Sequence, residues 1–358
     1  MQLRYLEAVD RRGSLTHLGR EIAKFPLEPS FTKALLYADL HGSILAKEQA
    51  DQGGRRRGND ARNTVLSDLL KLVSVLSTEN IWMSVAKNDE RGQQSIAAMR
   101  RKFRDPEGDH LGLVRAYDAW ANEKLVSNSS ELNDWCRRKH LQNRALMMAK
   151  NIKDQLSECM YSVDWTHIKE ILNKDIACIQ GPSLDASRSD QRSRNLRACL
   201  ALAFFMNACR RVPGARQEGA YLAIKDGLMM KLGQSQSLHQ EGQHPDWLIF
   251  TEASGSAAGS TGSGMIRMAS KIDLEWIQDK IPLLKETNVT ELCGLEPIEE
   301  SKHSTTEATK PSVGSKRPPV EDINKVCGSM SSEAATEKQS REAKLLELKA
   351  RFAKRQKR

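Results

Sequence analysis

The spacing of apolar residues predicts that helices make up most of the chain. Apolar side chains recur every three or four residues in several stretches, which is typical of helices that bury one face. The stretches predicted as helices are 1–12, 15–25, 31–40, 65–80, the residues that follow Asp109, 133–159 and 196–209. Ser14 or Thr16 is the expected N-cap of the second helix, and Pro26 is expected to end it because proline has no N–H.

Short strand patterns follow the last of these helices. They cover 220–224, 227–232, 247–252 and 265–272, and Asp226-Gly227 supplies a hairpin turn between the first two. Several short strands behind a helix fit a small, partly open barrel, and residues 273–284 are expected to close the folded part. The predicted fold class is therefore mainly α with a β-barrel.

Polar segments separate or follow these elements. Residues 182–194 are predicted to form a loop between domains, and the Gly-, Ser- and Ala-rich residues 254–264 a flexible loop between strands. From residue 287 onward the chain is rich in Glu, Ser and Thr, which predicts disorder. Residues 342–352 are a marginal helix within that tail.

Charge and cysteine content narrow the possible classes of protein. The 358 residues carry a formal charge of +9, and residues 341–358 hold eight Lys and Arg against two Glu, so the tail supplies +6 of that charge. A basic tail of this kind favours binding to polyanions. The seven cysteines form no CxxC pair, so neither a metal cage nor a disulfide framework is predicted. No apolar run is long enough to cross a bilayer, no signal region is visible, and we expect an intracellular protein without membrane contact.

Four stretches carry a resemblance to a known family. They are Leu15 to Arg20 with Phe25-Pro26-Leu27-Glu28-Pro29; Gly108-Asp109-His110-Leu111 with Tyr117 and Trp120; Pro245 to Phe250; and Met265-Ile266-Arg267-Met268. Together they closely resemble the C-terminal region of DEAH-box RNA helicases, in the same order and over about residues 3 to 285. The chain therefore looks like the downstream piece of a larger protein.

This resemblance implies a domain organisation. Residues 1–29 correspond to the end of a winged-helix domain, 30–181 to a helical ratchet (helicase-associated) domain, 182–195 to a linker and 196–286 to an oligonucleotide-binding (OB) fold. Residues 287–358 form the disordered tail with its basic end. In the family this region borders the RNA channel of an ATP-driven motor.

Several basic residues are candidates for RNA contact. In a helix over 133–159, Arg137, His140 and Arg144 would share one face with Arg138 beside them, either as a solvated face or as a ridge that touches successive phosphates. Lys153 stands where the family usually has Arg, Ser235 lies in a loop that departs from the family, and Arg267 falls on the family's strand arginine. Lys225 and Lys231 complete the predicted RNA-binding set. Arg55 to Arg57 belong to an apparent insertion, which reads either as a solvated loop or as a basic loop on phosphates.

No catalytic constellation accompanies these residues. Asp109 and His110 could be a catalytic pair, but no nucleophile accompanies them and Asp109 is the expected N-cap of the following helix. The sequence holds neither a GxxxxGK[S/T] phosphate loop nor an Asp-Glu-Ala-His motif, so no catalysis, cofactor or metal is predicted for this chain alone; the resemblance implies ATP and Mg²⁺ for a full-length helicase.

The resemblance then implies an RNA-binding region that serves a motor. Its predicted partners are single-stranded RNA, the helicase motor domains and glycine-rich G-patch activator proteins. Its predicted location is the nucleus (nucleoplasm or nucleolus) and, in addition, the cytoplasm. A stand-alone adaptor that binds proteins is the competing hypothesis. A third hypothesis, a self-contained hydrolase, is disfavoured because the sequence shows no arrangement of a nucleophile with a base.

Overall fold

The computed structural model describes residues 2–51, 58–86, 88–179, 188–212, 219–233, 237–240, 242, 244–254 and 264–281. The predicted tail, Ser235, Arg55 to Arg57 and residues 255–263 lie outside them. The helices are α1 (Gln2–Tyr5), α2 (His17–Ala23), α3 (Pro29–Asp51), α4 (Gly58–Leu76), α5 (Glu90–Arg101), α6 (His110–Val126), α7 (Ser129–Arg138), α8 (Asn143–Tyr161), α9 (Lys169–Ile176), α10 (Arg188–Phe204) and α11 (Ser237–Gln240). Short 3-10 turns are η1 (Ala177–Ile179), η2 (Phe205–Asn207) and η3 (Leu274–Trp276).

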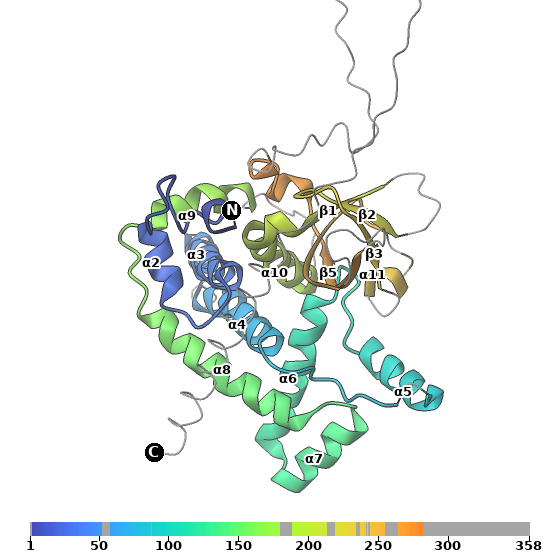
Figure 1. Ribbon diagram of the computed structural model, residues 1–358. Helices are drawn as coiled ribbons and strands as arrows, with labels where there is room; N and C mark the ends of the chain where they lie inside the picture. Colours follow the sequence, from blue (N-terminus) through green and yellow to red (C-terminus); the bar gives the residue numbers. More distant parts are fainter. Residues whose placement is uncertain are drawn as a thin grey trace, which may run out of the picture. The chain divides into compact units, whose positions relative to one another are not determined.

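Helix α3 is the central helix of the helical part. It packs along α4 and α10, while α8 and α6 cover α4 and α9 lies against α3 (Figure 1). One cluster of buried apolar side chains runs through these helices and continues to Trp276 and Ile277 beyond the last strand. The helical elements and the barrel belong to one compact unit. No helix among the described residues is long and apolar enough to cross a bilayer.

The start of the chain confirms the predicted helix cap. Thr16 Oγ1 accepts a hydrogen bond from Gly19 N at 2.9 Å, and Leu18, Ile22 and Phe25 are buried. The helix ends at Ala23, two residues before Phe25, and Leu15 is exposed. Gly19 permits this packing, because a Cβ atom there would lie 1.9 Å from the Ala8 carbonyl oxygen.

The predicted single helix over 133–159 is wrong. The chain forms α7 and α8 with a break at residues 139–142, where His140 has a φ of 54° in the left-handed region. The break has a long-range cause, since Met83 N donates to the His140 oxygen and Gln142 N donates to the Ile81 oxygen, both at 2.8 Å. These hydrogen bonds with residues 81–83 hold residues 139–142 in a non-helical turn. As a result, Arg137 and Arg144 lie on two different helices and do not share a helix face.

Five strands form a closed barrel: β1 (Ala208–Arg211), β2 (Ala220–Ala223), β3 (Met229–Leu232), β4 (Trp247–Ser254) and β5 (Gly264–Lys271). Their order is β1-β2-β3-β5-β4, and β4 pairs with β1 to close the circle. Strands β3 and β5 are parallel, while the other pairs are antiparallel. This arrangement is consistent with an OB-like domain.

The barrel corrects two details of the prediction. It is closed rather than partly open, because the predicted helix over 196–209 ends at Phe204 and residues 208–211 become the missing strand β1. The helix that precedes it starts at Arg188, inside the predicted linker, and its residues Ser193 and Asn195 are already buried. The four predicted strands are confirmed within a few residues, and Gly227 has the positive φ of 67° that the hairpin turn needs.

Candidate nucleic-acid interface

Residues 107–109 join the helical part to the barrel. Asp109 N donates to the Ala269 oxygen at 2.8 Å, and Lys271 N donates to the Glu107 oxygen at 2.9 Å, so this segment pairs with the end of β5. Gly108 makes the approach possible: its φ is 146°, and a Cβ atom there would lie 2.2 to 2.6 Å from atoms of Ser270. We call these three residues the 107–109 joint.

Asp109 has a different role from the predicted one. It precedes α6, but its side chain makes no cap hydrogen bond. Instead its carboxylate accepts hydrogen bonds from Ser237 N at 2.8 Å and from Ala269 N at 3.2 Å, both in the barrel region. Burial raises the pKa of Asp109, and the two N–H donors oppose that rise. The Asp109 carboxylate thus binds backbone N–H groups of the barrel region and not those in the first turn of its own helix.

His110 belongs to the same joint. Its ring is fully buried, with Nδ1 2.7 Å from the Ser270 hydroxyl and Nε2 2.9 Å from the Thr251 hydroxyl. Burial lowers the pKa of His110 to about 3, so the ring is neutral at physiological pH. Both nitrogens are occupied within the core, which agrees with a structural role for this residue rather than a catalytic one.

A cleft opens beside the joint, with a volume of about 580 Å³. One wall comes from the helical part and includes Trp82, Arg100, Phe103 and Arg104, and the other comes from the barrel and includes Glu252 and Met265–Met268. Along β5 the side chains alternate, so that Gly264 and Ile266 are buried while Met265 and Arg267 are exposed on the cleft side. We call this hollow the Arg267 cleft.

Arg100 is a half-buried cation in the wall of this cleft. Its guanidinium lies 5.2 Å from the centre of the Trp82 ring, and Trp82 packs against Phe103 with ring centres 5.8 Å apart. Its Nε atom is buried and has no hydrogen-bond partner within the described part of the chain. Burial lowers the pKa of Arg100, with the charge of Asp109 opposing that effect. A half-buried guanidinium with an unmatched donor is suited to an anionic ligand.

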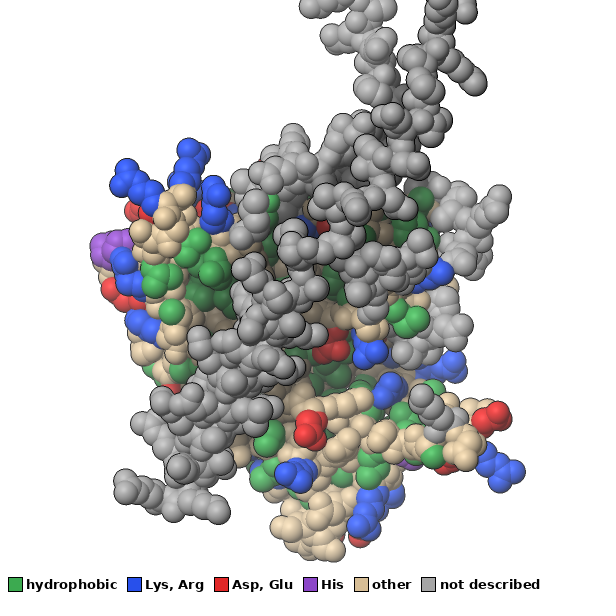
Figure 2. All heavy atoms as spheres, viewed as in Figure 1, with side chains coloured by type: hydrophobic (Ala, Val, Ile, Leu, Met, Phe, Trp, Pro, Cys, Tyr) green, Lys and Arg blue, Asp and Glu red, His purple; other side chains and the backbone are tan. Residues whose placement is uncertain are grey.

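The cleft is electrically mixed. Its described lining contains Arg100, Arg104 and Arg267 against Glu79, Asp109 and Glu252. Asp109 is already engaged by two backbone N–H groups, whereas Glu79 and Glu252 are exposed at the edge. Figure 2 shows Lys and Arg side chains spread over the face that carries the barrel, α5 and α7, with Asp and Glu side chains among them.

The predicted RNA-binding residues fall in different places. Arg267 lines the cleft; Arg137 and Arg138 are exposed in the last turn of α7; Arg144 is exposed and Lys153 half-buried on α8; Lys225 is exposed in the β2–β3 turn; and Lys231 is half-buried on β3. Lys153 Nζ lies 3.4 Å from the neighbouring Asp154 carboxylate. Only Arg267 of this set lines the cleft among the residues described.

The turn between α7 and α8 nevertheless touches the edge of the cleft. Beyond its backbone bonds to Ile81 and Met83, the His140 ring lies 2.7 Å from the Ser95 hydroxyl of α5. Arg137 and Arg144 flank this turn, whose partner segment includes the cleft residue Trp82.

Sequence reasoning missed Arg100 and Trp82. Helix α5, which carries Arg100, was not among the predicted helices. A signal was present in the run Arg100-Arg101-Lys102-Phe103, where basic residues stand beside an aromatic one. That run alone could not indicate that Trp82 would stack on the guanidinium.

Comparisons with known proteins agree with this architecture. Residues 1–27 match the family described as "Helicase associated domain (HA2), winged-helix". The chain is 26% identical over 271 residues to ATP-dependent RNA helicase DHX33 of Drosophila melanogaster, with 76% of this chain and 30% of that protein covered. It is 25% identical over 277 residues to pre-mRNA-splicing factor ATP-dependent RNA helicase prp22 of Schizosaccharomyces pombe, with 77% and 18% covered. The chain thus spans less than a third of the length of these relatives, and the matches confirm its resemblance to the C-terminal region of DEAH-box RNA helicases.

Proposed function

We propose that this chain binds single-stranded RNA in the Arg267 cleft and holds it for an ATP-driven helicase motor. The observation that carries the proposal is the pair of arginines on facing walls, Arg100 stacked on Trp82 and Arg267 exposed on β5. Guanidinium groups bind phosphate through paired N–H donors, and aromatic or guanidinium planes stack on unpaired bases.

The binding mode follows from this geometry. Backbone contacts dominate, so we expect little dependence on base sequence and a strong dependence on salt. Arg137, Arg138 and Arg144 extend the path from the edge of the cleft, since they flank the turn that pairs with residues 81–83. We propose that the remaining predicted residues contact the RNA outside the cleft; they are Lys153, Lys225, Lys231 and Ser235.

The wider role rests on the relatives. Both are named ATP-dependent RNA helicases, and the fission-yeast protein is also named a pre-mRNA-splicing factor. We infer that ATP and Mg²⁺ are bound by motor domains rather than by these residues, because the sequence has no phosphate-binding loop. A nuclear site of action in RNA processing, and docking of G-patch activators, are part of the proposal.

A titration with a fluorescent single-stranded RNA oligomer tests the binding role. Fluorescence anisotropy of the full chain at increasing salt should give a log–log slope of about −0.7 per phosphate contacted. Arg100→Ala should weaken binding about tenfold, because it removes a charged contact together with the guanidinium plane that stacks on Trp82. Lys174→Ala on α9 is the control, since it removes an exposed cation away from the cleft.

Two results would overturn the proposal. One is an affinity that does not change with salt, which would exclude backbone contact. The other is an equal loss of affinity for Arg100→Ala and Lys174→Ala, which would assign binding to general surface charge.

A further inference from the structure

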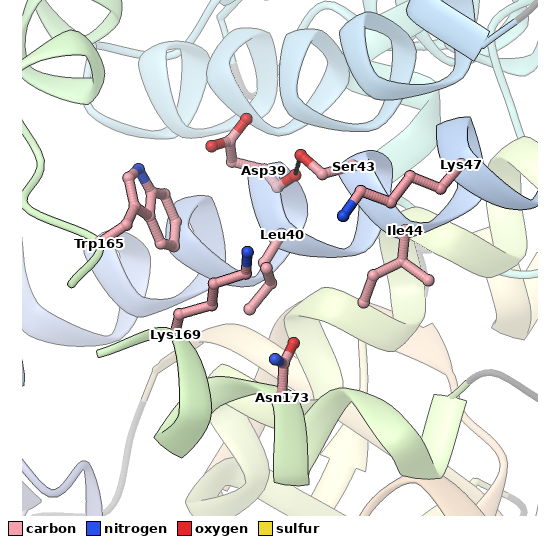
Figure 3. A pocket seen from close by; sticks show the side chains of 8 residues that line it. All are labelled: Asp39, Leu40, Ser43, Ile44, Lys47, Trp165, Lys169 and Asn173. Atoms are coloured by element: carbon pink, nitrogen blue, oxygen red, sulfur yellow. Dashed lines mark hydrogen bonds between the residues drawn. The ribbon is translucent and has the colours of Figure 1, made fainter. Parts of the chain in front are cut away.

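A second hollow lies between α3 and α9, away from the Arg267 cleft. It has a volume of about 640 Å³ and is lined by Asp39, Leu40, Ser43, Ile44, Lys47, Trp165, Lys169 and Asn173. Figure 3 shows the side chains of Lys47 and Lys169 pointing toward the space over Leu40, with the Asn173 amide beside them. We call it the α3–α9 pocket.

The lining of this pocket combines an apolar floor with positive charge. Leu40, Ile44 and Trp165 supply apolar surface, and Trp165 is only half-buried. Lys47 and Lys169 are exposed, and neither forms an ion pair with a carboxylate of the described residues. Asp39, the one carboxylate of the described lining, is buried. An occupant with apolar side chains and flanking carboxylates would match this surface.

The described chain ends close to this pocket. Lys280 pairs with Asp175 of α9, and Cys178 Sγ lies 3.4 Å from the Asp279 carboxylate. Lys169 and Asn173 precede Asp175 by six and two residues, or about 9 and 3 Å along the helix axis. The last described residues, up to Ile281, therefore lie beside α9 (Figure 1).

The sequence that follows has the matching chemistry. Residues 285–300 contain five Glu and one Lys, and their apolar residues Val289, Leu292, Leu295 and Ile298 recur every third position. The eleven residues that follow Ile281, up to Leu292, span about 18 Å root-mean-square if flexible, so the pocket is within reach. Tethering also gives such a segment an effective concentration near the millimolar range.

We propose that the acidic segment 285–300 docks in the α3–α9 pocket of its own chain. Its leucines cover Leu40, Ile44 and Trp165, and its glutamates lie against Lys47 and Lys169. The contact fixes the start of the C-terminal tail on the helical part of the chain. It does not depend on the RNA-binding proposal.

Cross-linking in the full chain tests this contact, because Cys293 is a natural probe inside the segment. We would replace Cys159, Cys178 and Cys327 with Ser and introduce Asn173→Cys at the pocket. A short bis-maleimide should then link positions 173 and 293 within one molecule, at least about tenfold faster than positions 130 and 293 in a Ser130→Cys control on α7. Tryptic mass spectrometry identifies the link, and thermal melting confirms that each variant is folded.

Charge reversal supplies the second measurement. Lys47→Glu with Lys169→Glu should slow the 173–293 link severalfold, up to about tenfold, since it replaces two attractions by repulsions. Arg137→Glu with Arg138→Glu makes the same change in net charge on α7 and should leave the rate unchanged. Equal rates at positions 173 and 130 would overturn the proposal, as would a rate indifferent to the Lys47 and Lys169 reversals. A link formed only between two molecules would assign the pocket to a second copy instead.

Discussion

The two halves of strand β5 serve different purposes. Ala269, Ser270 and Lys271 are tied to the helical part by backbone hydrogen bonds to residues 107–109 and by the His110 ring. Gly264 to Met268 instead form one wall of the Arg267 cleft, with Met265 and Arg267 exposed. One strand thus carries both a fixed joint and an exposed wall of the cleft.

This difference shows how the joint positions the cleft. The facing walls come from segments far apart in sequence, and their separation is set where residues 107–109 meet β5. Changes in the first half of β5 should therefore alter binding with little effect on folding. Changes in the second half should affect stability first.

Breaking the joint should have the largest effect. Gly108→Val would place a side chain within 2.6 Å of Ser270 at a φ that side chains rarely adopt, so we expect a loss of about 3 kcal/mol in the free energy of unfolding. Urea denaturation measures it. Gly13→Ala is the control: its φ of 85° is also unfavourable, but nothing lies within 4 Å, so only the backbone cost of about 1 kcal/mol should appear. Equal losses would mean that close packing at Gly108 does not hold the joint.

The buried histidine should give the joint a pH dependence. The pKa of His110 is lowered from 6.5 to about 3 in the folded chain, so between these values only the unfolded state takes up the proton. Stability should therefore fall as the pH is lowered, by roughly 2 kcal/mol between pH 6 and pH 4.5 from this residue. Denaturation of wild type and His110→Asn over that range measures the difference.

The contribution of His110 is the difference between the pH dependence of stability of wild type and that of His110→Asn. Burial also lowers the pKa of His41, which contributes a slope of the same sign to both. Identical pH slopes for wild type and His110→Asn would show that His110 is not held neutral in the core.

The sequence predicted those features that local rules determine. The Thr16 cap, the buried Leu18 and Ile22, and Arg267 on a strand follow from spacing or from motif resemblance, and the structure has them in place. Strand β1 was missed because its apolar residues continue the pattern of α10 without a break signal.

Long-range contacts explain the other errors. Nothing near His140 in sequence marks the break between α7 and α8, which depends on hydrogen bonds with residues 81–83. Asp109 stands where an N-cap should be, yet barrel N–H groups compete successfully for its carboxylate. In the cleft, the Arg100 guanidinium lies over the ring of Trp82, which stands eighteen positions earlier in the sequence.

The arginines around the α7–α8 turn should have a moderate effect on RNA binding. Replacing Arg137, Arg138 and Arg144 together by Gln should weaken binding about tenfold at low salt and flatten the log–log slope by up to about 2, or about 0.7 for each phosphate that is no longer bound. Unfolding should change little, because all three side chains are exposed. An unchanged slope would mean that these three arginines are solvated surface residues that do not contact phosphates.

Neutralising a cleft carboxylate should give the smallest and most informative change. Glu252 is exposed and lines the cleft on the strand paired with β5, so its charge opposes that of a phosphate near Arg267. Glu252→Gln should therefore tighten RNA binding about threefold at low salt, with the gain shrinking as salt screens the repulsion. Glu275→Gln, an exposed residue of η3 outside this cleft, is the matched control and should change affinity less. Anisotropy titrations at two salt concentrations compare them. A gain in Glu252→Gln alone would locate the bound strand along the first half of β5, whereas equal gains would show that RNA responds only to the overall charge of the chain.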